Sequence, residues 1–190
     1  MSQPTAIPPI PPVMPDASQL AWLKGFIRDV PDFPQPGILF RDITPLLENG
    51  VALRASIEWL AHRYRGAGIQ QVVGIESRGF IFGTPLAYLL GAGFVPVRKE
   101  GKLPGQTVRQ EYALEYGSNT LEMQADAVKP GQRVLVVDDL LATGGTTAAS
   151  VKLVERLGAA VVSLAFLIEL TALGGRQQLA GRDVYALLAY

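Results

Sequence analysis

The sequence predicts an α/β fold in which helices flank a mostly parallel, twisted sheet. Short apolar runs rich in valine, leucine and isoleucine alternate with segments whose apolar residues recur every three or four positions. Several of these runs are continuous rather than alternating, which is typical of parallel strands buried on both faces. Glycine and polar residues follow the runs, at the edge where open α/β sheets bind ligands.

The composition is that of one globular domain. Of 190 residues, 48% are hydrophobic and 18% are charged, and the formal net charge is zero. Zero net charge argues against general attraction to nucleic acid or anionic membranes. There is no cysteine and one histidine, His62, which excludes disulfides and a thiol nucleophile and argues against a Ser-His-Asp triad. Because no apolar run reaches the roughly 18 residues of a membrane span and no signal peptide is recognisable, we expect a cytoplasmic protein.

The N-terminal part separates into a tail and a first helix. Residues 1–16 contain six of the fourteen prolines, which predicts an extended tail that is flexible or draped over a second subunit. A proline-binding partner is the alternative. Residues 17–190 then form a single folded domain, in which Ser18 is the expected N-cap of a helix that ends before Pro31. The apolar face of this helix comprises Leu20, Leu23, Ile27 and Val30.

The remaining elements follow from apolar periodicity and from the prolines. Residues 32–47 contain Pro34, Pro36 and Pro45, which predicts a stiff, irregular loop. Helices are expected over 51–65 and 79–90, and from the loop at 142–146 through Leu157. Strands are expected over 71–75, 94–97, 121–123, 134–137, 160–170 and 184–190.

The most informative stretch runs from Arg133 to Ser150, RVLVVDDLLATGGTTAAS. Two adjacent carboxylates, Asp138 and Asp139, follow an apolar strand, and a glycine-rich turn then leads into a helix. Such a turn lets backbone N–H groups approach a phosphate, and a helix N-terminus favours an anion. Carboxylates beside a phosphate site suit sugar hydroxyls or a divalent metal rather than the phosphate itself. The stretch therefore predicts a site for a phosphorylated sugar with Mg²⁺, the alternative being an ordinary strand–turn–helix.

Residues 136–147 resemble the phosphoribosyl pyrophosphate (PRPP) signature of type I phosphoribosyltransferases. Three further segments resemble the adenine phosphoribosyltransferases in particular: FPQPGILFRDITPLL at 33–47, ESRGF at 76–80 and EYALEYG at 111–117. The resemblance covers about residues 17–190. It implies a type I phosphoribosyltransferase-like fold with an N-terminal hood at approximately 31–48 and a mobile lid loop at approximately 98–113.

The resemblance also implies an activity, which is transfer of the 5-phosphoribosyl group from PRPP to N9 of adenine, giving AMP and pyrophosphate in purine salvage. It implies Mg²⁺ bound with PRPP and a homodimer, with no nucleic-acid or membrane partner. Glu115 corresponds to the glutamate that pairs with purine N7 in this family, taking a proton forwards and returning it in reverse. The implied adenine-binding residues are Leu39, Phe40 and Arg41. Without the resemblance, packing of Phe40 in the core is the alternative.

The implied phosphate-binding residues form two groups. Those for the ribose and the 5′-phosphate are Asp138, Asp139, Ala142, Thr143, Gly144, Gly145 and Thr146. Those for pyrophosphate are Ser77, Arg78, Arg98, Lys99 and Lys102. Asp138 and Asp139 are also the implied metal ligands, directly or through Mg²⁺ bound to PRPP. Taken without the resemblance, the cations of the second group are equally typical of solvated surface charges.

Two other functions compete with this interpretation. A different purine or pyrimidine phosphoribosyltransferase would share the PRPP loop, but PRPP binding alone does not require the segments at 33–47 and 111–117. A PRPP-sensing regulator would keep the site without catalysis, but such proteins carry a nucleic-acid-binding module or a basic face, which zero net charge and a 16-residue tail do not favour. The absence of GxxxxGK[ST] excludes a P-loop NTPase, and no GxGxxG supports a dinucleotide-binding fold.

Overall fold

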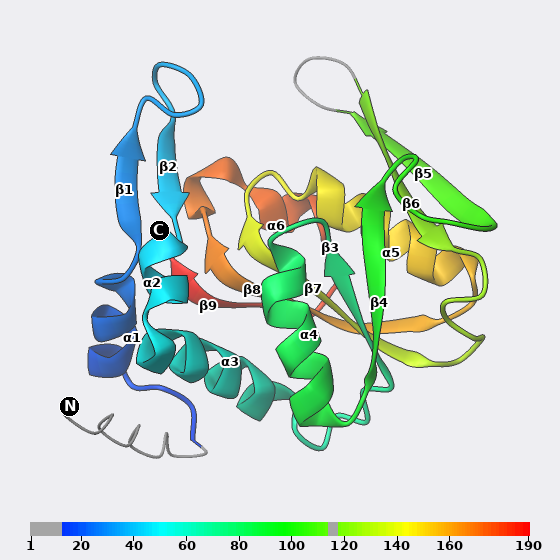
Figure 1. Cartoon of the computed structure of the whole chain (residues 1–190), viewed down its shortest axis with the longest axis horizontal. Helices are drawn as coiled ribbons and strands as arrows, with labels where there is room; N and C mark the ends of the chain where they lie inside the picture. Colours follow the sequence, from blue (N-terminus) through cyan, green and yellow to red (C-terminus); the bar gives the residue numbers. More distant parts are fainter. Residues whose placement is uncertain (1–12, 114–117) are drawn as a thin grey trace, which may run out of the picture. The chain divides into compact units, whose positions relative to one another are not determined.

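The computed structural model describes residues 13–113 and 118–190. The chain divides into two compact units, the first ending at Arg63 and the second beginning at Tyr64 (Figure 1). None of the helices in the described residues is long and apolar enough to cross a membrane.

A seven-stranded sheet forms the second unit, in the order β5-β6-β4-β3-β7-β8-β9. Its strands are β3 (Gln71–Ile75), β4 (Gly93–Lys99), β5 (Thr107–Ala113), β6 (Ser118–Gln124), β7 (Arg133–Leu141), β8 (Ala160–Glu169) and β9 (Val184–Ala189). The strands from β4 through β3, β7 and β8 to β9 pair in parallel, whereas β6 pairs antiparallel with both β4 and β5. This arrangement confirms the predicted α/β fold with a mostly parallel sheet.

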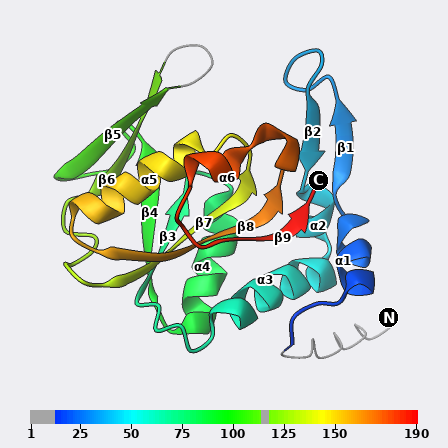
Figure 2. The same cartoon turned by 180° about the vertical axis from the view of Figure 1, so that it is seen from behind.

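Helices cover both faces of this sheet. α4 (Gly79–Leu90) follows β3 on one face, and α5 (Gly145–Arg156) follows β7 on the other (Figures 1 and 2). A short 3-10 turn, η1 (Thr171–Leu173), and α6 (Gly175–Gln178) connect β8 to β9. The run from Val134 to Val137 is at most 1% exposed at every residue. Burial between two helical layers explains why an unbroken apolar run, rather than an alternating one, encodes the central strand.

In the first unit, α1 (Ala17–Lys24) starts and ends earlier than the sequence pattern predicts. Its N-cap is Asp16, so the prediction of Ser18 was wrong. The Asp16 carboxylate accepts the N–H of Gln19 at 2.9 Å, and the Gln19 side chain accepts the N–H of Asp16 at 2.9 Å. This reciprocal capping box satisfies two backbone donors at once, which the Ser18 hydroxyl alone does not do. Gly25 then ends the helix.

A hairpin replaces the rest of the predicted helix and part of the predicted irregular loop. The other elements of the first unit are β1 (Arg28–Pro31), β2 (Leu39–Asp42), α2 (Thr44–Glu48) and α3 (Gly50–Tyr64), which ends at the first residue of the second unit. β1 and β2 pair antiparallel, with Val30 opposite Phe40. Val30 is therefore a strand residue rather than part of a helix face. Pro45 is tolerated in α2 because it lies in the first turn, where its missing N–H has no helical partner to lose.

Strand ends in the second unit also differ from the prediction. β4 continues through Arg98 and Lys99, because Arg98 pairs with Glu122 of β6. β7 continues two residues past Asp139, because β8 pairs with it as far as Glu169. Within the segment predicted to be a lid, residues 107–113 form β5 and only residues 100–106 form a connecting loop.

Asp42 at the end of β2 carries a pH-dependent contribution to stability. Hydrogen bonds from the hydroxyl and N–H of Thr44, with the Arg28 guanidinium, lower the pKa of Asp42 to about 2. A folded-state pKa below the unfolded value of about 3.9 gives stability that is present above that value and is lost as the pH falls towards about 2. We expect an NMR titration midpoint near 2 for this carboxyl group, and a higher one in Thr44→Val. An unchanged midpoint in Thr44→Val would contradict the assigned cause.

Candidate active site

Two adjacent carboxylates lie near the end of β7, past the last residue that pairs with β3. That pairing ends at Gly74 opposite Val137, so Asp138 and Asp139 lie at the edge where β3 gives way to a turn. Asp139 is 3% exposed, and Nε of Arg78 lies 3.0 Å from its Oδ2. The N–H of Asp139 donates to Oδ1 of Asp138 at 2.9 Å. The structure thus brings three predicted site residues together.

The negative charges of both carboxylates are poorly stabilised in this environment. Burial raises the pKa of Asp138 well above its ordinary value, and the neighbouring charge of Asp139 raises it further. Burial also raises the pKa of Asp139, although the Arg78 guanidinium acts in the opposite direction. Oδ2 of Asp139 accepts no hydrogen bond from the described residues, so its contact with Arg78 is electrostatic. Such a pair suits hydroxyl donors or a divalent cation, which stabilise the charged form.

Gly79, the first residue of α4, packs directly against these acids. A Cβ at this position would lie 2.8 Å from the carbonyl oxygen of Val137 and 2.9 Å from Oδ1 of Asp138. We expect Gly79→Ala to lower Tm by about 2–12 °C, because such overpacking costs about 1–3 kcal/mol. Gly50→Ala is the matched control, since Gly50 also begins a helix but a Cβ there meets nothing within 4 Å. Equal Tm values for the two variants in thermal unfolding would contradict the close approach.

The N-termini of α4 and α5 lie at the same edge, because each helix follows the carboxyl end of a parallel strand. Ser77 and Arg78 form the turn before α4, and Gly144 precedes α5. Neither N-cap residue makes a side-chain capping hydrogen bond, and neither first turn contains an acid. The first-turn N–H groups of α5 are therefore suited to anions, whereas in α4 the N–H groups of Phe80 and Ile81 already donate to the carbonyl oxygens of Ser77 and Arg78. Gly144 has a φ of 86°, a left-handed conformation that favours glycine.

A support that the sequence prediction missed lies against the glycine-rich loop. A Cβ on Gly144 would lie 2.6 Å from the carbonyl oxygen of Gly175, and a Cβ on Gly175 would lie 2.2 Å from the carbonyl oxygen of Ala142. The loop and the start of α6 are thus in backbone contact. Arg176 fixes α6 through an ion pair of 2.7 Å with Glu169, at the end of β8. The available signal was the pair of glycines at 174 and 175, directly after η1.

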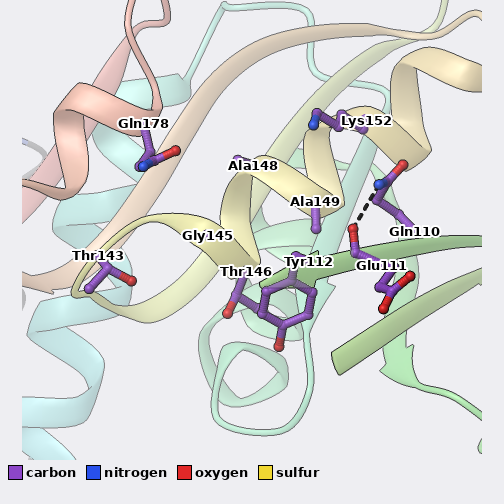
Figure 3. A pocket seen from close by; sticks show the side chains of 10 residues that line it. All are labelled: Gln110, Glu111, Tyr112, Thr143, Gly145, Thr146, Ala148, Ala149, Lys152 and Gln178. Atoms are coloured by element: carbon purple, nitrogen blue, oxygen red, sulfur yellow. Dashed lines mark hydrogen bonds between the residues drawn. The ribbon is translucent and has the colours of Figure 1, made fainter. Parts of the chain in front are cut away.

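A cavity of about 670 Å³ lies between α5, β5 and α6 (Figure 3). Its lining residues are Gln110, Glu111, Tyr112, Thr143, Gly145, Thr146, Ala148, Ala149, Lys152 and Gln178. Three predicted phosphate-binding residues therefore line this cavity, whereas the two acids do not. The contributions from β5 were not predicted as site residues because that strand was not recognised. The predicted catalytic Glu115 falls in the segment 114–117 between β5 and β6, outside the residues that the structure describes.

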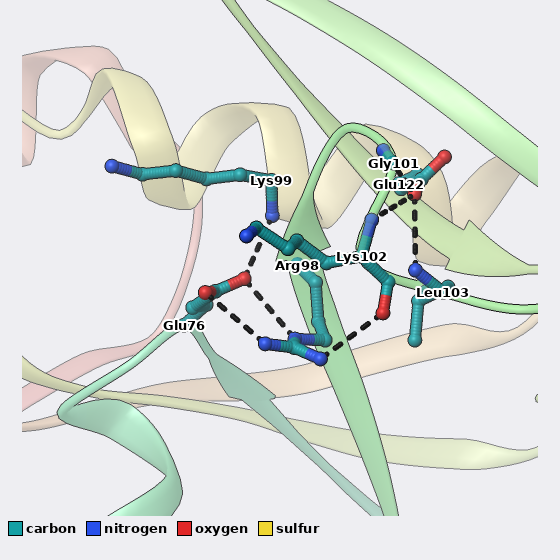
Figure 4. Close-up of polar contacts among 7 residues, drawn as sticks. All are labelled: Glu76, Arg98, Lys99, Gly101, Lys102, Leu103 and Glu122. Carbon is teal, nitrogen blue, oxygen red and sulfur yellow. Dashed lines mark hydrogen bonds and ion pairs between the residues drawn. The ribbon is translucent and has the colours of Figure 1, made fainter.

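The basic segment is tied to the end of β3 by Glu76 (Figure 4). Nε of Arg98 donates to Oε2 of Glu76 at 3.1 Å, and the N–H of Lys99 donates to the same oxygen at 3.0 Å. Burial by itself raises the pKa of Glu76, but the hydrogen bonds from Arg98 and Lys99 hold it below its ordinary value. A guanidinium nitrogen of Arg98 also donates to the carbonyl oxygen of Lys102 at 3.0 Å. The positive charge of Lys102 also contributes to the lowering of the Glu76 pKa.

The predicted adenine-binding residues lie in the first unit. They are three consecutive residues of β2: Leu39, Phe40 and Arg41. Leu39 is 46% exposed, and the ring of Phe40 packs edge-to-face on Phe33 with centroids 5.1 Å apart. Arg41 forms an ion pair with Asp29 across the hairpin. This strand therefore presents an apolar side chain and an aromatic ring next to backbone hydrogen-bonding groups.

Comparison with known proteins identifies the family. A model of the phosphoribosyl transferase domain matches residues 43–182. The chain is also 60% identical over 168 residues to the adenine phosphoribosyltransferase of Carboxydothermus hydrogenoformans. The aligned residues are 88% of this chain and 99% of that protein. The chain belongs to the adenine phosphoribosyltransferase family.

Solved adenine phosphoribosyltransferases share this fold. The enzyme from Thermoanaerobacter pseudethanolicus superposes with a TM-score of 0.88 at 55% identity, covering 90% of this chain and 99% of that one. The enzyme from Saccharomyces cerevisiae, solved with adenine and D-2,5-dideoxy-2,5-imino-altritol 1,6-bisphosphate, superposes with a TM-score of 0.87 at 42% identity, covering 91% and 100%. These comparisons confirm the type I phosphoribosyltransferase fold that the sequence motifs implied.

Proposed function

We propose that this adenine phosphoribosyltransferase transfers the 5-phosphoribosyl group of PRPP to N9 of adenine, giving AMP and pyrophosphate for purine salvage. The observation that supports it most is the poorly compensated pair Asp138 and Asp139 at the end of β7, next to the uncapped N-terminus of α5. This combination provides acceptors for sugar hydroxyls and donors for a phosphate within one strand–turn–helix unit.

The PRPP loop holds the ribose 5′-phosphate. The first-turn N–H groups of α5 donate to the phosphate oxygens, and the hydroxyls of Thr143 and Thr146 add two further donors beside the cavity. Gly144 supplies the left-handed backbone conformation of the turn, and Gly145 places its N–H in the first turn of α5. Ala142 contributes its backbone at the start of the loop. The carboxylates of β7 accept the ribose hydroxyls.

Mg²⁺ fits this set of donors when it is held mainly by the substrate. The described residues contain no cluster of three or more metal-binding side chains. Mg²⁺ commonly uses one or two carboxylates together with substrate phosphates and water, which matches Asp138 and Asp139, whose Oδ2 accepts no hydrogen bond from the described residues. When bound with PRPP, Mg²⁺ supplies positive charge to the departing pyrophosphate.

Cations and helix N–H groups hold the pyrophosphate. Ser77 and Arg78 precede the uncapped N-terminus of α4, while Arg98, Lys99 and Lys102 extend from β4 and the loop that follows. As the bond to the ribose breaks, negative charge accumulates on pyrophosphate and positive charge on the ribose. Positive side chains aimed at the leaving group lower this barrier. Closure of residues 98–113 as a lid keeps water from attacking the ribose.

The hood and the segment that contains Glu115 bind the base. Phe40 stacks on the purine ring, and the backbone of Leu39 and Arg41 hydrogen-bonds to the purine edge. Glu115 takes the proton that adenine loses when N9 attacks, through its pairing with N7. Support comes from the Saccharomyces cerevisiae enzyme, whose structure contains adenine.

We also propose that the protein forms a homodimer and is located in the cytoplasm. α4 presents Ile81 and Tyr88 to solvent, with exposures of 38% and 85%. Large apolar side chains on one helix are typical of protein–protein interfaces. The lack of cysteine fits a reducing compartment.

A parallel assay of five bases tests the proposed function. The protein is incubated with PRPP and Mg²⁺ and with adenine, hypoxanthine, guanine, uracil or orotate, and the nucleotide products are measured. AMP formed from adenine alone is the expected result. Product from another base would keep the PRPP site and overturn the assignment of the hood. PRPP binding without product from any base would overturn the catalytic proposal and favour a PRPP-sensing regulator.

A further inference from the structure

β6 carries a buried carboxylate next to the loop that joins β4 to β5. In the sheet order β5-β6-β4, this connection, residues 100–106, has to cross β6. Glu122 of β6 lies opposite Arg98 of β4 and also opposite Arg109 of β5. It is 1% exposed. A charged side chain at such a depth is costly unless it is fully hydrogen-bonded.

The partners of Glu122 among the described residues belong to the crossing loop or to β5. Oε1 accepts three backbone N–H groups, at 2.8, 3.2 and 3.3 Å, from Gly101, Lys102 and Leu103 (Figure 4). Three successive N–H groups that converge on one oxygen form a nest, a backbone concavity suited to an anion. Oε2 accepts the hydroxyl of Thr107 at 3.1 Å, and Nε of Arg109 lies 3.5 Å away.

Glu122 remains ionised in spite of its burial. Burial raises the pKa of its carboxyl group, but the hydrogen bonds from the loop N–H groups and Thr107 outweigh this and hold the pKa below its ordinary value. At neutral pH the loop backbone is therefore bound to a full negative charge, and such charge-assisted hydrogen bonds are about twice as strong as neutral ones. The backbone N–H groups of Gly101, Lys102 and Leu103 thus share Glu122 as their acceptor.

Both backbone polar groups of Lys102 are hydrogen-bonded. Its N–H donates to Glu122, and its carbonyl oxygen accepts from Arg98, which Glu76 holds in turn. The ammonium group of Lys102 extends away from Glu122 in Figure 4. We propose that Glu122 is a positioning residue that fixes the backbone of the loop so that Lys102, together with Lys99, meets the pyrophosphate of PRPP. This inference rests on the proposed function, which supplies the pyrophosphate contacts.

Glu122→Gln tests the inference in the full-length protein. Glutamine keeps the size of the side chain but has no charge and only one acceptor oxygen, so it cannot satisfy both the nest and Thr107. We expect KM for PRPP, and KM for pyrophosphate in the reverse reaction, to rise about tenfold or more, while KM for adenine changes less than about twofold. A merely structural role would lower Tm and total activity without separating these KM values.

Hydrogen exchange provides a readout that is independent of catalysis. The backbone N–H groups of residues 101–103 should exchange faster in Glu122→Gln than in the wild type, because they lose their charged acceptor. Glu155→Gln is the matched control. Glu155 is an exposed carboxylate of α5 that pairs with Arg182 and has no contact with Glu122 or the loop among the described residues, so its replacement should leave exchange and the KM values unchanged.

Two further variants separate the possible outcomes. If Glu122 acts through Lys102, the losses of Glu122→Gln and Lys102→Ala are less than additive in the double variant, and full additivity would overturn this route. If Glu122→Gln does not fold, Thr107→Val removes only the bond to Oε2. This variant should raise KM for PRPP selectively, but by less than Glu122→Gln.

Equal rises in KM for PRPP and adenine, or unchanged exchange at residues 101–103, would overturn the inference. A wild-type protein inactive with adenine would overturn the proposed function, and exchange would still decide whether Glu122 anchors the loop.

Discussion

Glu115→Gln is expected to lower kcat by about 100- to 10,000-fold while leaving Kd for PRPP nearly unchanged. Attack by N9 requires adenine to lose a proton, and a glutamine of the same size cannot accept it. PRPP is assigned to other parts of the fold, namely the acids of β7 and the N-termini of α4 and α5. Glu115 follows β5, whose residues Gln110 to Tyr112 line the cavity beside the PRPP loop.

Steady-state kinetics with adenine and a calorimetric titration with PRPP measure the two parts of this prediction. Asp126→Asn is the control, because it removes an exposed carboxylate just after β6 and should change neither value. A loss of PRPP affinity that paralleled the loss of kcat would show that the assignment to the base was wrong. An unchanged kcat would remove Glu115 from the proton transfer.

Replacing Asp138 and Asp139 together with asparagine is expected to raise Kd for PRPP by about 100- to 10,000-fold. Hydrogen bonds to a charged group contribute about 1.5–3 kcal/mol each, and the double variant weakens the contacts of both carboxylates with the ribose and with Mg²⁺. Asparagine has nearly the same shape as aspartate, so the close contact between Asp138 and Gly79 is retained.

The double variant is expected to fold, because burial raises the pKa of both carboxyl groups and a neutral amide avoids the desolvation that causes this rise. Thermal unfolding checks that expectation before the titration is interpreted. Glu155→Gln serves as the control, since Glu155 is an exposed residue of α5 that pairs with Arg182. A PRPP titration identical to that of the wild type would remove the ribose role of the acids.

The central strands and the PRPP loop could be predicted from the sequence because their signals are local. The unbroken apolar runs at 72–75 and 134–137 lie in β3 and β7, since both faces of these strands are buried. Asp138, Asp139 and the glycines that follow identify a ligand site because carboxyl ends of parallel strands meet at one edge. The structure places Arg78 beside Asp139, two residues that the sequence motifs assigned to different parts of PRPP.

The assignments of the adenine-binding residues and of Glu115 have a different basis from those of the PRPP loop. Phe40 and its neighbours were assigned from the family motif, and the structure adds that they lie on a strand rather than in an irregular loop. The roles of Phe40 and Glu115 remain predictions, which the base assay and the Glu115→Gln kinetics address.

The sequence by itself determined the type of α3, α4 and α5 and of the buried strands β3, β7 and β8, and it predicted the chemistry of the PRPP loop. Tertiary structure alone decided where β4 and β7 end, that Val30 pairs with Phe40 in a hairpin, that Gly175 supports Gly144, and that Glu122 holds the basic loop. The physical reason is the distance along the chain between partners. Helix periodicity and glycine-rich turns are satisfied by contacts within a few residues, whereas the extent of a strand and the partners of a buried carboxylate depend on which distant segments meet in the folded chain.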